Sequence, residues 1–310
     1  MIGEICYWLF NMSIVASLSG AVILLFRRVR RIPRRLIALL WAIPCIRMWV
    51  PFGIGGRYGL MSLLNALRYR TRVVYVLRPV AYGREGGTSM MNVTGATVDG
   101  SIPLTYREDL LRDLFRVAGI VWAAVFGLLL LLIVILYFSA LRDLRGAAHL
   151  RENLYLSDRV TSPAVYGIFR PKIVLPASTP EADYPMILAH ETAHIRRGDN
   201  LFRLIAFLSV ALHWFNPLAW VFLRCYLSDA EEACDERVLS KLDEEGRRNY
   251  ARCLLNQAER RAAFPAAFGG AKLRDRVKRI VSYENLTFFS ALGCVLLAAA
   301  LTYFLLTNAL

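Results

Sequence analysis

Residues Ile187–Asn200 read ILAHETAHIRRGDN, and the interpretation of the whole chain starts from them. Within this stretch His190, Glu191 and His194 form the pattern H-E-x-x-H. Residues four apart share one face of a helix, so both imidazoles can bind one zinc ion while Glu191 lies beside the metal as a general base. The pattern therefore predicts a helix that carries a catalytic zinc site. The alternative is a charged helix in which histidine recurs by chance.

The acidic run Asp229–Glu236, DAEEACDE, is the second candidate element of this site. A catalytic zinc ion usually takes three protein ligands and leaves one position open. Glu231 and Asp235 are spaced i, i+4 and share a helical face. We expect Glu231 to be the third zinc ligand and Asp235 to accept a hydrogen bond from a zinc-bound histidine. Glu232 and Glu236 share another face, which predicts a solvated charged surface.

Two more polar residues are candidates for contact with the zinc ligands. Asp199 follows the motif helix, where its carboxylate can either orient a zinc-bound imidazole or cap the next helix. His213 is expected to have a structural role or to contact a ligand, since three ligands are already assigned. The six cysteines form no C-x-x-C pair, so neither a cysteine-based zinc site nor a disulfide framework is expected.

The composition predicts an integral membrane protein, because 56% of the residues are hydrophobic and the mean hydropathy is +0.42. The formal net charge of +14 would also suit a nucleic-acid-binding protein. The basic residues, however, are largely clustered beside apolar runs, where charge determines membrane topology. We therefore expect a lipid bilayer as the surroundings and no direct nucleic-acid binding.

Four apolar stretches are long enough to be transmembrane helices. Six arginines follow the first stretch, between positions 27 and 35. The positive-inside rule places this loop in the cytoplasm, so both termini are expected outside the cell in a multi-pass membrane protein. The sequence is expected to divide into three regions. The first is a membrane region, 1–141, with spans at about 5–26, 36–54 and 117–141 and an outer loop at 55–116. A cytoplasmic protease domain at 142–285 follows, and then a fourth span within 286–310.

The apolar stretch 204–223 would pass as a fifth span by length alone. A crossing would place His190 and the acidic run Asp229–Glu236 on opposite sides of the membrane, where they could not share a metal. We therefore expect two shorter helices with a break near Asn216 and Pro217, either buried in the domain or dipping into the membrane.

Short strand-like stretches precede the zinc motif, at 153–159, 162–169 and 171–176. In many zinc proteases an edge strand lies along the metal site and pairs with the substrate backbone. One of these strands can serve that purpose. A small sheet that only covers the helices is an equal alternative.

Four motifs together resemble the membrane-embedded gluzincin peptidases of the BlaR/MecR type, which are beta-lactam sensor-transducers. They are YGIFRPKIVLP at Tyr166–Pro176, HETAHIRRGDN at His190–Asn200, WFNPLAW at Trp214–Trp220 and DAEEACDERVL at Asp229–Leu239.

This resemblance implies an α-helical integral membrane protein with four transmembrane helices and an inserted cytoplasmic α+β gluzincin-type zinc protease domain. It implies His190, His194 and Glu231 as ligands of Zn²⁺ and Glu191 as the base. It also implies cleavage of a protein substrate, either the chain itself or a winged-helix transcriptional repressor, as in an antirepressor.

The named members of that family carry a penicillin-binding sensor domain after the last span, whereas the sequence stops there. A sensor would then be a separate partner protein. Two other functions fit the motifs: a CAAX-processing or quality-control membrane zinc protease, and a non-catalytic signalling or scaffold protein with structural zinc. The presence of Glu191 favours catalysis, because a structural zinc site has no need of that carboxylate.

Overall fold

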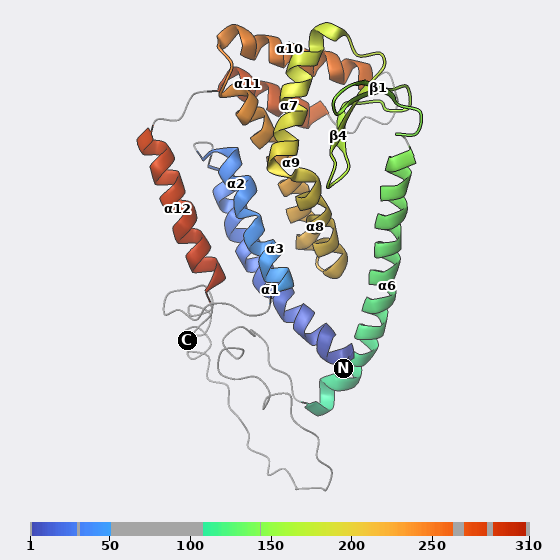
Figure 1. The fold of residues 1–310 in the computed structure, drawn as a ribbon. Coiled ribbons are helices and arrows are strands. Elements are labelled where there is room, and N and C mark those ends of the chain that lie inside the picture. The colour runs from blue at the N-terminus through green and yellow to red at the C-terminus, as the bar shows by residue number, and fades with distance from the viewer. Residues whose placement is uncertain are drawn as a thin grey trace, which may run out of the picture.

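The computed structural model describes residues 2–29, 32–50, 108–142, 144–262, 270–283 and 288–307. The described chain is mostly helical, with one small sheet (Figure 1). Most of the expected outer loop 55–116 lies outside the described residues. The helices are α1 (Ile2–Arg27), α2 (Arg34–Leu40), α3 (Ala42–Trp49), α6 (Glu108–Arg142), α7 (Tyr184–Arg197), α8 (Asp199–Leu212), α9 (Pro217–Leu239), α10 (Glu244–Ala262), α11 (Gly270–Val281) and α12 (Phe288–Leu306).

Two of the described helices are long and apolar enough to cross a membrane, namely α1 and the segment Leu114–Arg142 of α6. Their N-terminal parts meet where the rings of Tyr7 and Phe115 pack edge to face at 5.5 Å. The other two expected spans are shorter in the structure. The stretch 36–54 is represented by α2 and α3, and the apolar part of α12 is Ser290–Leu306.

The interruption between α2 and α3 follows from Pro44. Proline has no N–H to donate to the carbonyl of the residue four positions earlier, so a continuous hydrogen-bonded helix cannot pass through Leu40. Trp41 keeps helical backbone angles at the junction, and the two short helices therefore continue in sequence without a loop. Buried Arg47 then joins α3 to the end of α12 by donating to the carbonyls of Leu305 and Thr307, each at 3.0 Å.

Helices α8 and α9 form a hairpin, as expected for a stretch 204–223 that folds back. Asn216 caps α9 by accepting the backbone N–H of Leu218 at 2.9 Å, and its amide donates to the hydroxyls of Ser13 and Ser17 on α1. On another side of the hairpin, Trp122 of α6 donates to the carbonyl of Leu212 at 2.8 Å. The tip of the hairpin is therefore packed between the two apolar helices that are long enough to span a membrane.

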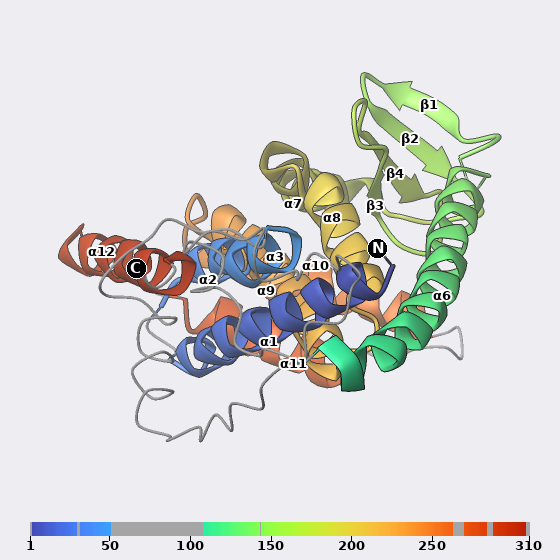
Figure 2. The same ribbon diagram turned by 90° about the horizontal axis from the view of Figure 1, so that it is seen from below.

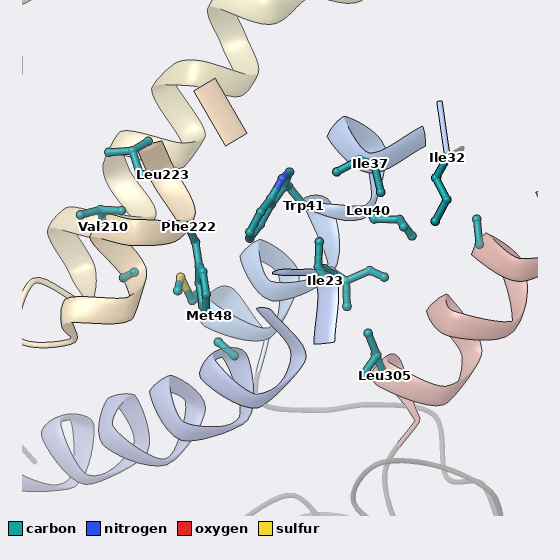
Figure 3. Packing of buried hydrophobic residues seen from close by; sticks show 14 residues of the cluster. Ile23, Ile32, Ile37, Leu40, Trp41, Met48, Val210, Phe222, Leu223 and Leu305 are labelled. Carbon is teal, nitrogen blue, oxygen red and sulfur yellow. The ribbon is translucent and has the colours of Figure 1, made fainter. Parts of the chain in front are cut away.

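The largest hydrophobic cluster joins this hairpin to α1, α2, α3 and α12 (Figure 3). At its centre the rings of Trp41 and Phe222 lie 5.5 Å apart. Gly20 of α1 faces the same ring, and a Cβ atom there would lie 2.3 Å from Phe222. Only glycine lets α1 and α9 approach this closely, so the helix that enters the metal site is packed directly on the membrane helices.

The sheet lies beside α7 and α8, close to the C-terminal end of α6 (Figure 2). Its order is β1-β2-β4-β3, with β2 and β4 parallel and β3 antiparallel to β4 at one edge. The buried face of β4 packs on Ile187 of α7 and Cys253 of α10. The strands are β1 (Ala148–Arg151), β2 (Leu154–Ser157), β3 (Ala164–Tyr166) and β4 (Lys172–Pro176).

Candidate metal centre

Helices α7 and α9 bring three potential metal ligands together. The Nε2 atoms of His190 and His194 lie 3.1 Å apart, and each is 3.6 Å from a carboxylate oxygen of Glu231. One ligand atom from each residue lies within 4.8 Å of the other two. Two imidazole nitrogens and one carboxylate are a donor set that suits zinc and leaves a fourth tetrahedral position open. The residues therefore fit the metal expected from the motif.

The local backbone explains how α7 delivers these side chains. Gly198 adopts a left-handed conformation at φ 68°, which ends α7 and lets α8 begin at the very next residue. The turn points the Asp199 carboxylate back at the last turn of α7. Ala193 of α7 and Ala230 and Ala233 of α9 are buried, and small side chains of this kind permit close packing of helices.

Both imidazoles are oriented through their Nδ1 atoms. Asp199 accepts from Nδ1 of His194 at 2.6 Å. The hydroxyl of Tyr250 on α10 donates its proton to Asp235 at 2.7 Å. The same oxygen lies 2.8 Å from Nδ1 of His190. Because the hydroxyl proton is already used, Nδ1 of His190 is the donor in this second hydrogen bond. With the proton on Nδ1, the lone pair of each Nε2 is directed at the common ligand position.

The carboxylates raise the basicity of both rings in the metal-free site. Burial lowers the pKa of His190, but hydrogen bonds and charges from Asp235 and Glu231 raise it to about 9. Burial acts the same way on His194, and Asp199, Cys234 and Glu231 raise its pKa to about 12. In return, the two histidines hold the pKa of Glu231 well below its usual range against the effect of burial. The metal must therefore compete with protons for this site.

Two arginines complete the surroundings of the carboxylate ligand. Arg203 of α8 donates to Glu231 at 2.6 Å. Arg276 of α11 makes two hydrogen bonds to Asp235, at 2.7 and 2.8 Å, and lies 3.9 Å from Glu231. Neither arginine was identified from the sequence, nor was Tyr250, because each comes from a helix without a recognisable motif.

Cys234 is a further neighbour that the sequence did not single out. Its Sγ lies 3.3 Å from Nδ1 of His194 and 3.4 Å from Asp199. His194, Asp199 and Cys234 thus form a second group of potential ligand atoms. This group uses Nδ1 of His194, so a metal there would require Nδ1 to lose its proton and its hydrogen bond to Asp199.

Glu191 lines a cavity of about 310 Å³ together with the three potential ligands. Its side chain is buried, with 8% of the residue exposed. Ala164 and Val165 of the edge strand β3 line the same cavity. Asn200 ties this strand to α8 by donating to the carbonyls of Val165 and Gly167, at 3.0 and 2.8 Å. An edge strand, a carboxylate and the ligand cluster therefore share one cavity.

Other predicted residues lie elsewhere. His213 is at the far end of α8, where its Nε2 lies 2.9 Å from the carbonyl oxygen of Met48. Fourteen helical residues separate it from Asp199, a rise of about 21 Å, so it does not contact the ligands. Glu232 and Glu236 do not form a solvated surface. Glu232 is 8% exposed and paired with Arg34, and Glu236 accepts backbone N–H groups from α2.

Comparison with known proteins gives a family match over most of the chain. The family model described as BlaR1 peptidase M56 matches residues 7–282. The regulatory protein BlaR1 of Bacillus licheniformis is 34% identical over 110 residues, which cover 34% of this chain and 18% of that protein. The methicillin resistance mecR1 protein of Staphylococcus aureus is 26% identical over 141 residues, covering 42% of this chain and 24% of mecR1. The match therefore spans less than a quarter of each of these relatives.

Proposed function

The chain belongs to the BlaR1 peptidase M56 family, and from this premise we propose that it is a membrane-bound zinc endopeptidase that acts in signal transduction. One observation carries the proposal. His190, His194 and Glu231 converge beside Glu191 in a single cavity, which is the arrangement that metal-assisted peptide hydrolysis requires.

The proposed mechanism assigns a role to each side chain around the cavity. A bound zinc ion supplies Lewis acidity and lowers the pKa of a water molecule towards about 7. Glu191 removes the proton from the attacking water and later delivers it to the leaving amine. Asp199 and Tyr250 keep the imidazoles in the orientation that binds metal. The backbone edge of β3 lies beside the cavity, where a substrate strand can pair with it.

We propose the topology expected from the charge pattern for this family member. The arginine-rich loop between α1 and α2 would lie in the cytoplasm, with the protease domain 142–285 on the same side. The spans would be 5–26, 36–54, 117–141 and a fourth within 286–310. This arrangement gives the catalytic cavity access to soluble cytoplasmic proteins.

The proposed substrate is a cytoplasmic transcriptional repressor, the chain itself, or both. Two relatives are named as a regulatory protein and as a methicillin resistance protein, which supports a regulatory rather than a degradative function. A CAAX-processing or quality-control protease remains the alternative within the same chemistry, and a scaffold with structural zinc the alternative outside it.

Proteomics of cells that express the wild type or the Glu191→Gln variant separates these functions. The amide keeps the size of the side chain but cannot accept the proton of the attacking water, so general-base catalysis should be lost by a factor of about 10² to 10⁴. A defined fragment of one repressor, absent from the variant, supports the proposal. Fragments of many membrane proteins would indicate quality control, and identical fragment patterns in both strains would contradict proteolysis.

A further inference from the structure

A second, apolar cavity of about 530 Å³ lies between α2–α3 and the α8–α9 hairpin. It is separate from the metal cavity, although both are lined by residues of α8. Its size is within the range of about 300–1,000 Å³ found for sites that bind small molecules. The cavity runs along helices that pack on the membrane-spanning α1, so its occupant should be a molecule of the bilayer.

The two ends of this cavity differ in chemistry. Arg35 at the start of α2 and Arg197 at the end of α7 line one end, and Met48 and Val210 line the other. Hydrogen bonds between Ser209 and the side chains of Cys45 and Trp49 join α3 to α8 near the apolar end. Asp199 also lines the arginine end, where the two arginines leave an excess of positive charge, so an amphiphile with an anionic head and an apolar tail would fit.

The cavity is open at the side. On the described part of the chain, three large apolar residues at its rim remain exposed: Leu39 at 66%, Phe202 at 52% and Ile46 at 43%. Side chains of this kind at membrane depth face lipid rather than water. A chain in the bilayer can therefore enter between α3 and α8 without first passing through water.

Both arginines at the polar end have partners, but Arg35 is only partly neutralised. Arg35 pairs with Glu236 at 3.6 Å, and 47% of its side chain remains exposed. Arg197 contacts Asp199 at 3.4 Å and donates to the carbonyl of Ala230. The loop that leads into α2 adds further arginines, and a cluster of this kind beside an apolar surface attracts anionic lipid.

We propose that this cavity binds one acyl chain of an anionic phospholipid, with the head group between Arg35 and Arg197. The Arg197 contact to Asp199 would bring the head group next to the residue that orients His194. The proposal concerns lipid binding and does not depend on proteolysis.

The test is native mass spectrometry of the full chain after release from nanodiscs of phosphatidylglycerol and phosphatidylcholine. The wild type should retain phosphatidylglycerol preferentially. Arg35→Gln should lower that preference about fivefold, the effect of one basic residue near an anionic surface. The control Arg248→Gln, an exposed arginine of α10 that lies outside this cluster and does not line the cavity, should leave it unchanged. Equal retention of both lipids by the wild type would overturn the proposal.

A second variant tests the tail. Ala206→Phe fills the cavity from α8 and should reduce retention of both lipids, whereas Leu128→Phe on the exposed surface of α6 should not. Unchanged retention in Ala206→Phe would contradict binding in this cavity.

Photo-cross-linking from p-benzoylphenylalanine at Leu39 identifies the occupant directly. Adducts from Leu39 that are enriched in phosphatidylglycerol over those from the lipid-facing control position Leu128 support the proposal. Cross-linked dimers of the chain in place of lipid adducts would mean that a helix of a second copy occupies the groove, and would overturn it.

Discussion

Helix α9 carries two sets of carboxylates that lie within eight residues, Asp229–Glu236, but face different parts of the molecule. The first set, Glu231 and Asp235, faces the histidines of α7. The residues of both sets are acidic, and the sets differ in the side of the helix on which they lie. The second set, which faces α1, a helix long enough to cross a membrane, and the adjoining α2, consists of Asp229, Glu232 and Glu236.

The face towards α1 and α2 is as fully paired as the metal face. Asp229 is completely buried and accepts from Arg27 at 2.9 Å, Arg34 at 3.3 Å and Trp41 at 2.8 Å. Glu236 accepts the backbone N–H groups of residues 34 and 35, which are free donors in the first turn of α2. One helix therefore links the membrane region to the residue that would bind metal, and each face can be tested separately.

The largest effect is expected on stability, from Asp229→Asn. The substitution removes the counter-charge of Arg27 and leaves Arg34 with Glu232 alone, and breaking a buried ion pair from one side costs about 3–5 kcal/mol. Thermal unfolding of the purified chain should show this loss, while zinc affinity stays at the wild-type value. A variant that melts normally but binds zinc weakly would show that the two faces are not independent.

Glu231→Gln should have the reverse effect. It removes the proposed carboxylate ligand, so zinc affinity should fall by more than the roughly 10–100-fold typical of residues that only support a ligand. Competition with a zinc chelator measures the change. The matched variant Glu232→Gln, one residue along on the other face, should retain wild-type zinc affinity; equal losses in both would contradict the assignment of faces.

Zinc affinity should also depend on pH. The surrounding carboxylates raise the pKa of His190 to about 9 and that of His194 to about 12, so the metal-free site retains an additional proton on the paired Nε2 atoms at neutral pH. Zinc must displace protons, so affinity should rise with pH from 6 to 9, by about tenfold per unit for each proton displaced. Titration calorimetry in buffers of different ionisation enthalpy measures how many protons are released when zinc binds. Zinc binding without proton release would contradict this prediction.

The smallest effect on the metal is expected from Asp235→Asn, since this residue acts through His190 and Tyr250. Loss of such a partner typically lowers metal affinity about 10–100-fold. The control is Glu236→Gln, which should leave metal affinity unchanged and cost only about 0.3–1 kcal/mol through the N-terminus of α2. A larger loss of zinc in the control than in Asp235→Asn would reverse the comparison.

The spacing of residues within single helices was the most informative part of the sequence. It placed His190 and His194 on one face and Glu231 and Asp235 on another, while the need for a third zinc ligand joined Glu231 to the histidines. Asp199 had two possible roles, and in the structure its carboxylate accepts from His194. The assignments to faces succeed because the 3.6-residue period determines which side chains share a face.

Partners that lie far apart in the chain could not be inferred in this way. Arg203, Tyr250 and Arg276 reach the site only through tertiary packing. Glu236 was expected in solvent because its partners at the start of α2 lie about 200 positions earlier. The third strand-like stretch, 171–176, contains β4, whereas β1 was missed because it has only four residues, all of them exposed, and therefore no buried face.

The central claim is that zinc is bound by His190, His194 and Glu231. X-ray absorption at the zinc edge of the full-length protein tests it most directly. Ligation by these residues predicts only nitrogen and oxygen neighbours at about 2.0–2.2 Å, with imidazole scattering from two rings. A sulfur neighbour at about 2.3 Å would instead place the metal at Cys234, and would contradict the account.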